Sequence, residues 1–197
     1  MNVPIHPRPE PVATVPTRYG DLIFHAFTDA SGRDHVAVIS GEIKGKSDVL
    51  CRIHSECLTS EVLGSLKCDC RDQLDLALQR IAHEGGIVLY LRQEGRGIGL
   101  ANKLRAYALQ SEGADTVDAN RLLGLEDDLR SYEFAAHVLN ELGVESVRLM
   151  TNNPAKILGL QTEGIEVSHE PHQAEADGQA QDYLDAKRDR MGHLLAQ

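Results

Sequence analysis

The first third of the chain is a succession of short apolar runs separated by turn-forming residues. Runs of this length, rich in Val, Ile, Leu and Phe, are typical of β-strands. Asp29-Ala30-Ser31-Gly32, between the first two runs, has the composition of a tight turn. The pattern predicts three strands, over residues 20–27, 35–40 and 49–54.

The hydrophobic spacing changes after Arg71 to that of a helix. Leu74, Leu78 and Ile81 fall on one helical face, and Gly85-Gly86 ends the pattern. The apolar run over residues 87–91 then predicts a buried strand.

The remaining elements include a helix that Asn153 caps, with Pro154 at its first position. We expect helices over about residues 100–110, 132–142, 154–164 and 183–195. We expect strands over 147–150 and 165–167. Residues 116–128 form a polar segment, and we expect a loop over 168–181. These elements predict an α+β fold, a single domain of mixed β-sheet layers flanked by helices. A length of 197 residues fits one domain.

Residues 1–19 hold five of the seven prolines and no apolar run that would suit a signal peptide or a membrane span. We expect a mobile, proline-rich arm over 1–19, a catalytic domain over 20–197 and a cytoplasmic protein. The formal net charge of -10 argues against a protein that coats nucleic acid, because such binding needs many Lys and Arg contacts to phosphates. A small nucleotide can still bind where a few basic residues converge in one cleft.

Three cysteines follow the third predicted strand at a spacing that suits a metal site. Cys57 lies at the strand end, and Cys68 and Cys70 lie just before a helix. Catalytic zinc sites commonly have three protein ligands and an open fourth position, whereas structural sites have four ligands. Cys51 is the candidate fourth ligand of a structural site, and a metal-free cluster is the remaining alternative. His54 is not assigned to the metal.

Two loops have the composition of phosphate-binding turns at helix starts. The first, residues 92–100, is rich in glycine, but Leu100 breaks the dinucleotide fingerprint. The second, residues 151–156, ends in Lys156. With Arg52, Arg96 and Arg130 they supply a local positive field, although each cation taken singly also fits a solvated surface position.

Four segments in this order resemble GTP cyclohydrolase II, and the resemblance spans about residues 49–167. They are RIHSECLT over 52–59, LKCDC over 66–70, RQEGRGIGL over 92–100 and LMTNNP over 149–154. The resemblance implies hydrolysis of GTP to 2,5-diamino-6-(5-phosphoribosylamino)pyrimidin-4(3H)-one, formate and pyrophosphate, the first committed step of riboflavin biosynthesis. It also implies a homodimer, with GTP as the partner and no membrane or nucleic acid.

The resemblance further assigns roles to individual residues. One Zn²⁺ per subunit would be held by Cys57, Cys68 and Cys70, and Mg²⁺ would accompany the triphosphate. Tyr107 would be the active-site tyrosine, Asp128 the proton acceptor and Arg130 the group that attacks the α-phosphate. The residues expected to hold GTP are Arg52, Ile53, His54, Ser55, Glu56, Gln73, Glu94, Gly95, Arg96, Thr116, Thr151 and Lys156.

Arg130 is an unusual nucleophile, because a guanidinium has a pKa above about 12 and stays charged. Electrostatic stabilisation of the departing pyrophosphate is the simpler role. The sequence departs from the family pattern over 168–181 and at Ala186. Two alternatives therefore stay open: a relative that releases a formylated product, and a catalytically silent protein that binds GTP.

Overall fold

The computed structural model describes residues 11–111, 116–126 and 128–172. One mixed sheet organises them, with the strand order β1-β2-β3-β5-β4-β6-β7. The strands are β1 (Val12–Thr17), β2 (Gly20–Thr28), β3 (Asp34–Ser40), β4 (Val49–Ser55), β5 (Gly86–Leu91), β6 (Ser146–Met150) and β7 (Glu166–Glu170). β1, β2, β3 and β5 pair antiparallel, whereas β5, β4, β6 and β7 pair parallel. The carboxyl ends of β4, β5, β6 and β7 therefore meet at one edge.

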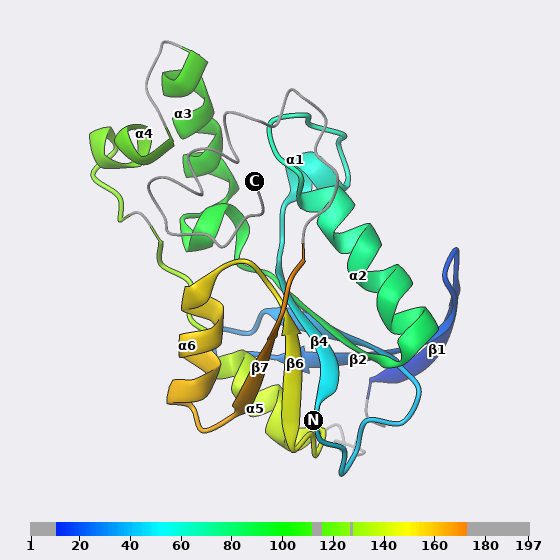
Figure 1. The fold of residues 1–197 in the computed structure, drawn as a ribbon. Helices are drawn as coiled ribbons and strands as arrows, with labels where there is room; N and C mark the ends of the chain where they lie inside the picture. Colours follow the sequence, from blue (N-terminus) through cyan, green and yellow to red (C-terminus); the bar gives the residue numbers. More distant parts are fainter. Residues whose placement is uncertain (1–10, 112–115, 127, 173–197) are drawn as a thin grey trace, which may run out of the picture.

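Helices cover both faces of the parallel half of the sheet. They are α1 (Leu58–Glu61), α2 (Cys70–Glu84), the 3₁₀ turn η1 (Glu94–Gly97), α3 (Gly99–Ser111), α4 (Thr116–Leu122), α5 (Glu133–Glu141) and α6 (Pro154–Thr162). Figure 1 shows α2 on one side of the strands, α5 and α6 on the other, and α3 with α4 beyond the strand ends. Among the described helices, none has the length and apolar character that a bilayer crossing requires.

Neighbouring residues of β4 lie in two different cores. Leu50 packs with Ala77 and Ile81 of α2, while Cys51 packs in the larger core with Leu139 of α5. All but the last residue of β4 are buried, since a parallel strand with helices on both faces has no solvent side. Fully burying an Ile such as Ile81 contributes roughly 1.5–3 kcal/mol.

A glycine is required where α2 turns into β5. At Gly86, which has a φ of 141°, an added Cβ would lie 2.3 Å from the carbonyl oxygen of Leu50. The Gly85-Gly86 pair therefore ends the helix and lets β5 lie against β4.

The α+β prediction is confirmed, with one mixed sheet flanked by helices in a single domain. Three local expectations were wrong. Residues 12–17, expected in a mobile arm, form β1 and pair with β2. β7 continues to Glu170, into the expected loop, because it pairs with β6. The polar segment contains α4, which packs on α3. The expected helix over 183–195 lies outside the described residues.

Candidate active site

A cleft lies at the carboxyl ends of β4, β5 and β6. The loops that follow these strands form its walls together with α2 and α3, because parallel strands bring such loops to one edge. Most of the predicted site residues line it: Arg52, His54, Ser55, Glu56, Cys57, Cys68, Cys70, Gln73, Glu94, Gly95, Arg96, Tyr107, Arg130, Thr151 and Lys156. The fold thus collects segments that lie about a hundred positions apart in the chain.

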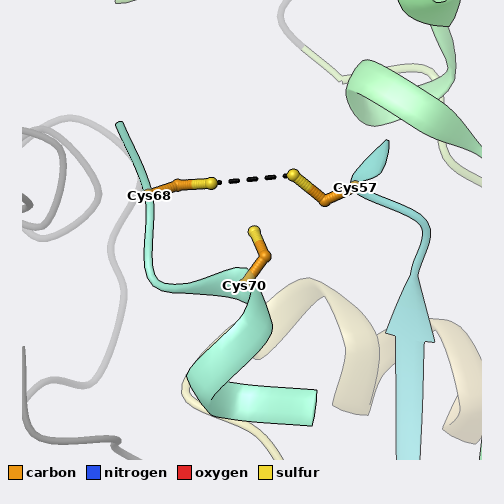
Figure 2. A group of neighbouring side chains, drawn as sticks. All are labelled: Cys57, Cys68 and Cys70. Atoms are coloured by element: carbon orange, nitrogen blue, oxygen red, sulfur yellow. Dashed lines mark hydrogen bonds between the residues drawn. The ribbon is translucent and has the colours of Figure 1, made fainter. Parts of the chain in front are cut away.

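Three thiols converge in the wall of this cleft. Cys57 follows β4, Cys68 ends the loop after α1, and Cys70 is the first residue of α2, so a short excursion of the chain brings all three together (Figure 2). Their sulfur atoms lie within 4.8 Å of one another, and those of Cys57 and Cys68 are 3.6 Å apart. Such a donor set suits a soft, tetrahedral ion such as zinc. The cluster can therefore hold a metal.

The surroundings of the cluster favour thiolate at Cys57. Hydrogen bonds from Cys68 and Cys70 and the ammonium of Lys103 hold the pKa of Cys57 well below its ordinary value. The same contacts with Cys57 raise the pKa values of Cys68 and Cys70, since neighbouring thiols cannot all ionise without a cation. A divalent ion would supply that cation.

Cys51 does not join the cluster. It is fully buried in the core, and burial raises the pKa of its thiol to about 12. Among the described residues, the metal-binding group contains Cys57, Cys68 and Cys70 without a fourth His, Cys, Asp or Glu. All three thiols also line the cleft, so the geometry favours an open site over a closed structural one.

The turn after β5 carries Glu94, and its carboxylate anchors several parts of the site. Oε2 accepts a hydrogen bond from the backbone N–H of Leu58 at 2.7 Å, and Oε1 accepts from the N–H of Gly95 at 2.8 Å. Oε1 also accepts from Nζ of Lys103 at 2.7 Å. Sequence reasoning missed Lys103, although its place one helical turn after the glycine-rich loop was a usable signal.

Arg96 takes up an uncommon backbone conformation in the same turn. Its φ is 60°, in the left-handed region, and its carbonyl oxygen accepts from the N–H of Leu129 at 3.0 Å. Within the described part of the chain, the buried Nη1 of Arg96 has no hydrogen-bond partner. An unsatisfied guanidinium N–H at the wall of a cleft is suited to an anion.

Arg52 links three walls of the cleft. Its Nη1 donates to the carbonyl oxygen of Met150 at 2.8 Å, and its Nη2 donates to Oε1 of Gln73 at 2.5 Å. Nε2 of Gln73 donates in turn to Oδ2 of Asp69 at 2.5 Å. Burial lowers the pKa of Arg52 to about 10, which still leaves it charged at neutral pH.

The loop after β6 places a further cation in the cleft. Asn153 caps α6 by accepting from the N–H of Ala155 at 2.9 Å, as its position before Pro154 predicted. Lys156 is buried, and its Nζ donates to the carbonyl oxygen of Ile53 at 2.7 Å. The side chain of Ile53 itself lies in the core, so only its backbone takes part in this wall.

His54 belongs to a buried network rather than to the thiol cluster. Its Nε2 lies 2.8 Å from Oε1 of Glu61, and the hydroxyl of Tyr90 donates to Oε2 of Glu61 at 2.5 Å. His54 thus lies outside the group of described residues that could hold a metal. The network ties β4 and β5 to α1 beside the cleft.

Arg130 lines the cleft, and Asp128, which is not among the lining residues, pairs with it. The guanidinium donates to both carboxylate oxygens of Asp128, through Nε at 2.8 Å and through Nη2. Burial alone would raise the pKa of Asp128, but the hydrogen bonds from Arg130 hold it below its ordinary value. The pair therefore consists of a carboxylate and a guanidinium. The side chain of Thr116 lies outside the described residues.

Tyr107 and His172 complete the cleft. The ring of Tyr107 lies under Nζ of Lys67 and of Lys103, at 5.3 and 5.7 Å from its centroid, and burial raises its pKa to about 12. His172 was missed in the segment expected to be a loop. Its Nε2 donates to the carbonyl oxygen of Gln73, and its backbone is paired with the Asn152 side chain. The carbonyl is an acceptor only, so the proton of His172 is on Nε2.

Comparison with known proteins identifies the family. A family model described as GTP cyclohydrolase II matches residues 8–171. The GTP cyclohydrolase-2 of Picrophilus torridus is 47% identical over 185 residues, covering 93% of this chain and 96% of that protein. This chain belongs to the GTP cyclohydrolase II family. The resemblance drawn from four short segments is thus confirmed over most of the chain.

Longer relatives of the GTP cyclohydrolase II family match the same region. The riboflavin biosynthesis protein RibBA of Bacillus subtilis is 50% identical over 186 residues, which cover 92% of this chain and 47% of that protein. RibBA of Endomicrobium trichonymphae is 48% identical over 184 residues, 92% of this chain and 46% of that protein. The chain therefore spans about half the length of these RibBA relatives.

Proposed function

We propose that this chain is a zinc-dependent GTP cyclohydrolase II that converts GTP to 2,5-diamino-6-(5-phosphoribosylamino)pyrimidin-4(3H)-one, formate and pyrophosphate. The observation that carries the proposal is the convergence of three thiols with the cleft-lining cations Arg52, Arg96 and Lys156. A metal site beside an anion-binding cleft suits a substrate that has both a ring to be opened and a triphosphate. Membership of the family and the GTP cyclohydrolase-2 relative support GTP as that substrate.

In this proposal Cys57, Cys68 and Cys70 hold one zinc ion. When bound, zinc would supply Lewis acidity, which can make water a usable nucleophile near neutral pH. The phenol of Tyr107 stays protonated at that pH, since its pKa is about 12, and can therefore donate a hydrogen bond or a proton to the ring as it opens.

Arg130 would stabilise the departing pyrophosphate rather than attack it. Its two hydrogen bonds to Asp128 keep the guanidinium charged and oriented, and a charged guanidinium has no free lone pair. Asp128 then acts as a positioning carboxylate and as a local proton acceptor. Mg²⁺ on the triphosphate would share the neutralisation of charge.

The remaining predicted contacts to GTP form part of the same proposal. We assign the binding of GTP to Arg52, the backbone of Ile53, His54, Ser55, Glu56, Gln73, Glu94, Gly95, Arg96, Thr116, Thr151 and Lys156. A homodimer in the cytoplasm, and a catalytic domain that includes β1, are the accompanying proposals.

The test is an analysis of products from purified, zinc-loaded protein and GTP. From the wild type we expect equal amounts of pyrophosphate, formate and the diaminopyrimidine by mass spectrometry. Cys68→Ser should give no products. Cys51→Ala should still give them, since Cys51 is the cysteine outside the cluster. A product heavier by one formyl group would favour the formylated alternative. GTP binding without turnover would favour the silent one, and either result would displace the proposal.

A further inference from the structure

Lys103, in the first part of α3, is a buried lysine whose ammonium contacts the thiol cluster. Its Nζ lies 3.0 Å from Sγ of Cys57 and 2.7 Å from Oε1 of Glu94. The side chains of Lys103 and Glu94 are only 12% and 10% exposed. Removing two charges from water is unfavourable unless each is well paired. The contact with sulfur is therefore maintained by the packing and is not a chance encounter at the surface.

Glu94 holds this ammonium in place. Its carboxylate also accepts from the backbone N–H groups of Leu58 and Gly95, so it is tied both to the residue after Cys57 and to the turn after β5. An ammonium has three protons and no lone pair, so the sulfur of Cys57 must be the acceptor in the second contact. Accepting from a cation is the role of a thiolate.

We infer that Lys103 is a positioning residue of the proposed metal centre, whose ammonium donates a hydrogen bond to the Cys57 thiolate and so sets its direction and its electron donation to the bound ion. The inference rests on the metal site of the proposed function. Three thiolates and one divalent ion leave a net charge of -1, which the ammonium of Lys103 offsets in a poorly solvated place. Loss of such an outer partner typically weakens metal binding about 10–100-fold.

The test is the absorption spectrum of the full chain loaded with Co²⁺, with the zinc dissociation constant from chelator competition as a second readout. Lys103→Met keeps most of the aliphatic chain and removes the donor. We expect its thiolate-to-cobalt charge-transfer band at a longer wavelength, because an unbonded thiolate gives up an electron more easily. Its zinc dissociation constant should rise about 10–100-fold.

Two control variants separate the hydrogen bond from other effects. Lys67→Met removes an exposed lysine that lies as close to the Tyr107 ring as Lys103 does, and it should leave the band in place. Glu94→Gln keeps the lysine but removes the carboxylate charge that holds its ammonium, so its band should shift less than that of Lys103→Met. A shift in Lys67→Met as large as that in Lys103→Met would show that the hydrogen bond to Cys57 is not the cause, and would overturn the inference.

The outcomes also separate this inference from the proposed function. A wild-type spectrum and zinc affinity in Lys103→Met would overturn the role of Lys103 and leave the GTP reaction standing. If the wild-type protein binds cobalt through its thiolates but does not turn over GTP, the proposed function fails and the role of Lys103 at the metal site stands. If circular dichroism shows that Lys103→Met is unfolded, Lys103→Gln provides the same test, with a smaller shift expected because its neutral amide lacks the charge.

Discussion

Nδ1 of His35 on β3 accepts a hydrogen bond of 3.0 Å from the backbone N–H of Arg92. The backbone N–H is only a donor, so the ring proton of His35 is on Nε2, which faces Oδ2 of Asp29 at 3.2 Å. Arg33, bonded to the same carboxylate, reaches the carbonyl oxygen of Arg92 at 3.5 Å. The start of β3 and the turn before it thereby hold the backbone N–H and carbonyl groups of Arg92, the first residue of the loop that contains Glu94 and Arg96.

The first prediction concerns this contact. His35→Leu removes the acceptor of the Arg92 N–H. In His35→Asn the amide Oδ1 lies near the former position of Nδ1, so an acceptor is kept. A hydrogen bond of about 0.5–1.5 kcal/mol predicts a loss of up to roughly tenfold in kcat/KM for GTP in the Leu variant and a smaller loss in the Asn variant. Hydrogen exchange of the Arg92 amide, faster only in His35→Leu, checks the cause. Equal behaviour of the two variants would refute it.

The second prediction concerns the thiol cluster and stability. A ligand that binds only the folded state stabilises it, by about 4 kcal/mol when its free concentration is 1,000 times the dissociation constant. A chelator should therefore lower the unfolding midpoint of the wild type and of Cys51→Ala but leave that of Cys70→Ser unchanged. Scanning calorimetry with and without zinc measures this. A wild type indifferent to the chelator would count against the metal site.

The third prediction concerns Tyr107. Tyr107→Phe keeps the ring beneath the two lysines but removes the hydroxyl, so we expect kcat to fall about 10²–10⁴-fold with little change in KM. Tyr19→Phe is the control: Tyr19 donates to Asp75 at the far side of α2, away from the cleft, and should keep its kcat. Steady-state kinetics of pyrophosphate release give both values. A rise in KM with kcat unchanged would mean that Tyr107 binds GTP without taking part in the chemistry.

The fourth prediction concerns pH and His172. Burial lowers the pKa of this imidazole to about 3, below the ordinary value of 6.5. Between these values the unfolded chain binds more protons than the folded one, so the free energy of unfolding should fall as pH falls from about 6.5 toward 3. One such group contributes at most about 1.4 kcal/mol per pH unit.

Denaturant unfolding at several pH values tests the role of His172. His172→Gln keeps an N–H donor for Gln73 but does not titrate, so its stability should depend less steeply on pH than that of the wild type. His137→Gln, at an exposed position on α5, should keep the wild-type slope. Identical slopes for the wild type and His172→Gln would show that His172 is not the titrating group.

Much of this fold follows from local signals in the sequence. Apolar runs identified β2 to β6, and the Asn153-Pro154 cap identified α6, because these signals depend on neighbouring residues only. β1 was missed since the prolines of residues 1–19 suggested an arm, and its place depends on pairing with β2. The polar composition before Asp128 hid α4, which is supported by packing on α3.

The site shows the same division between local and distant information. The cysteine spacing and the glycine-rich turn are read within a few residues, so the thiols and Arg96 were identified from the sequence. Lys103 and His172 were not, since each acts through partners that only the fold brings near: Cys57 for Lys103, and Gln73 for His172. The position of Lys103 just after the glycine-rich loop marks it as a candidate, but its contact with Cys57 depends on the fold.

The pairing of β1 with β2 also sets where this protein can be shortened. A version that begins at Gly20 would lose six paired positions, from Val12 to Thr17, and would leave the hydrogen-bonding groups along the outer side of β2 bare. An unprotected strand of this length is a template for chain-to-chain association. β1 thus protects the edge of β2 from association with other chains, and expression of the catalytic unit should start ahead of Pro11.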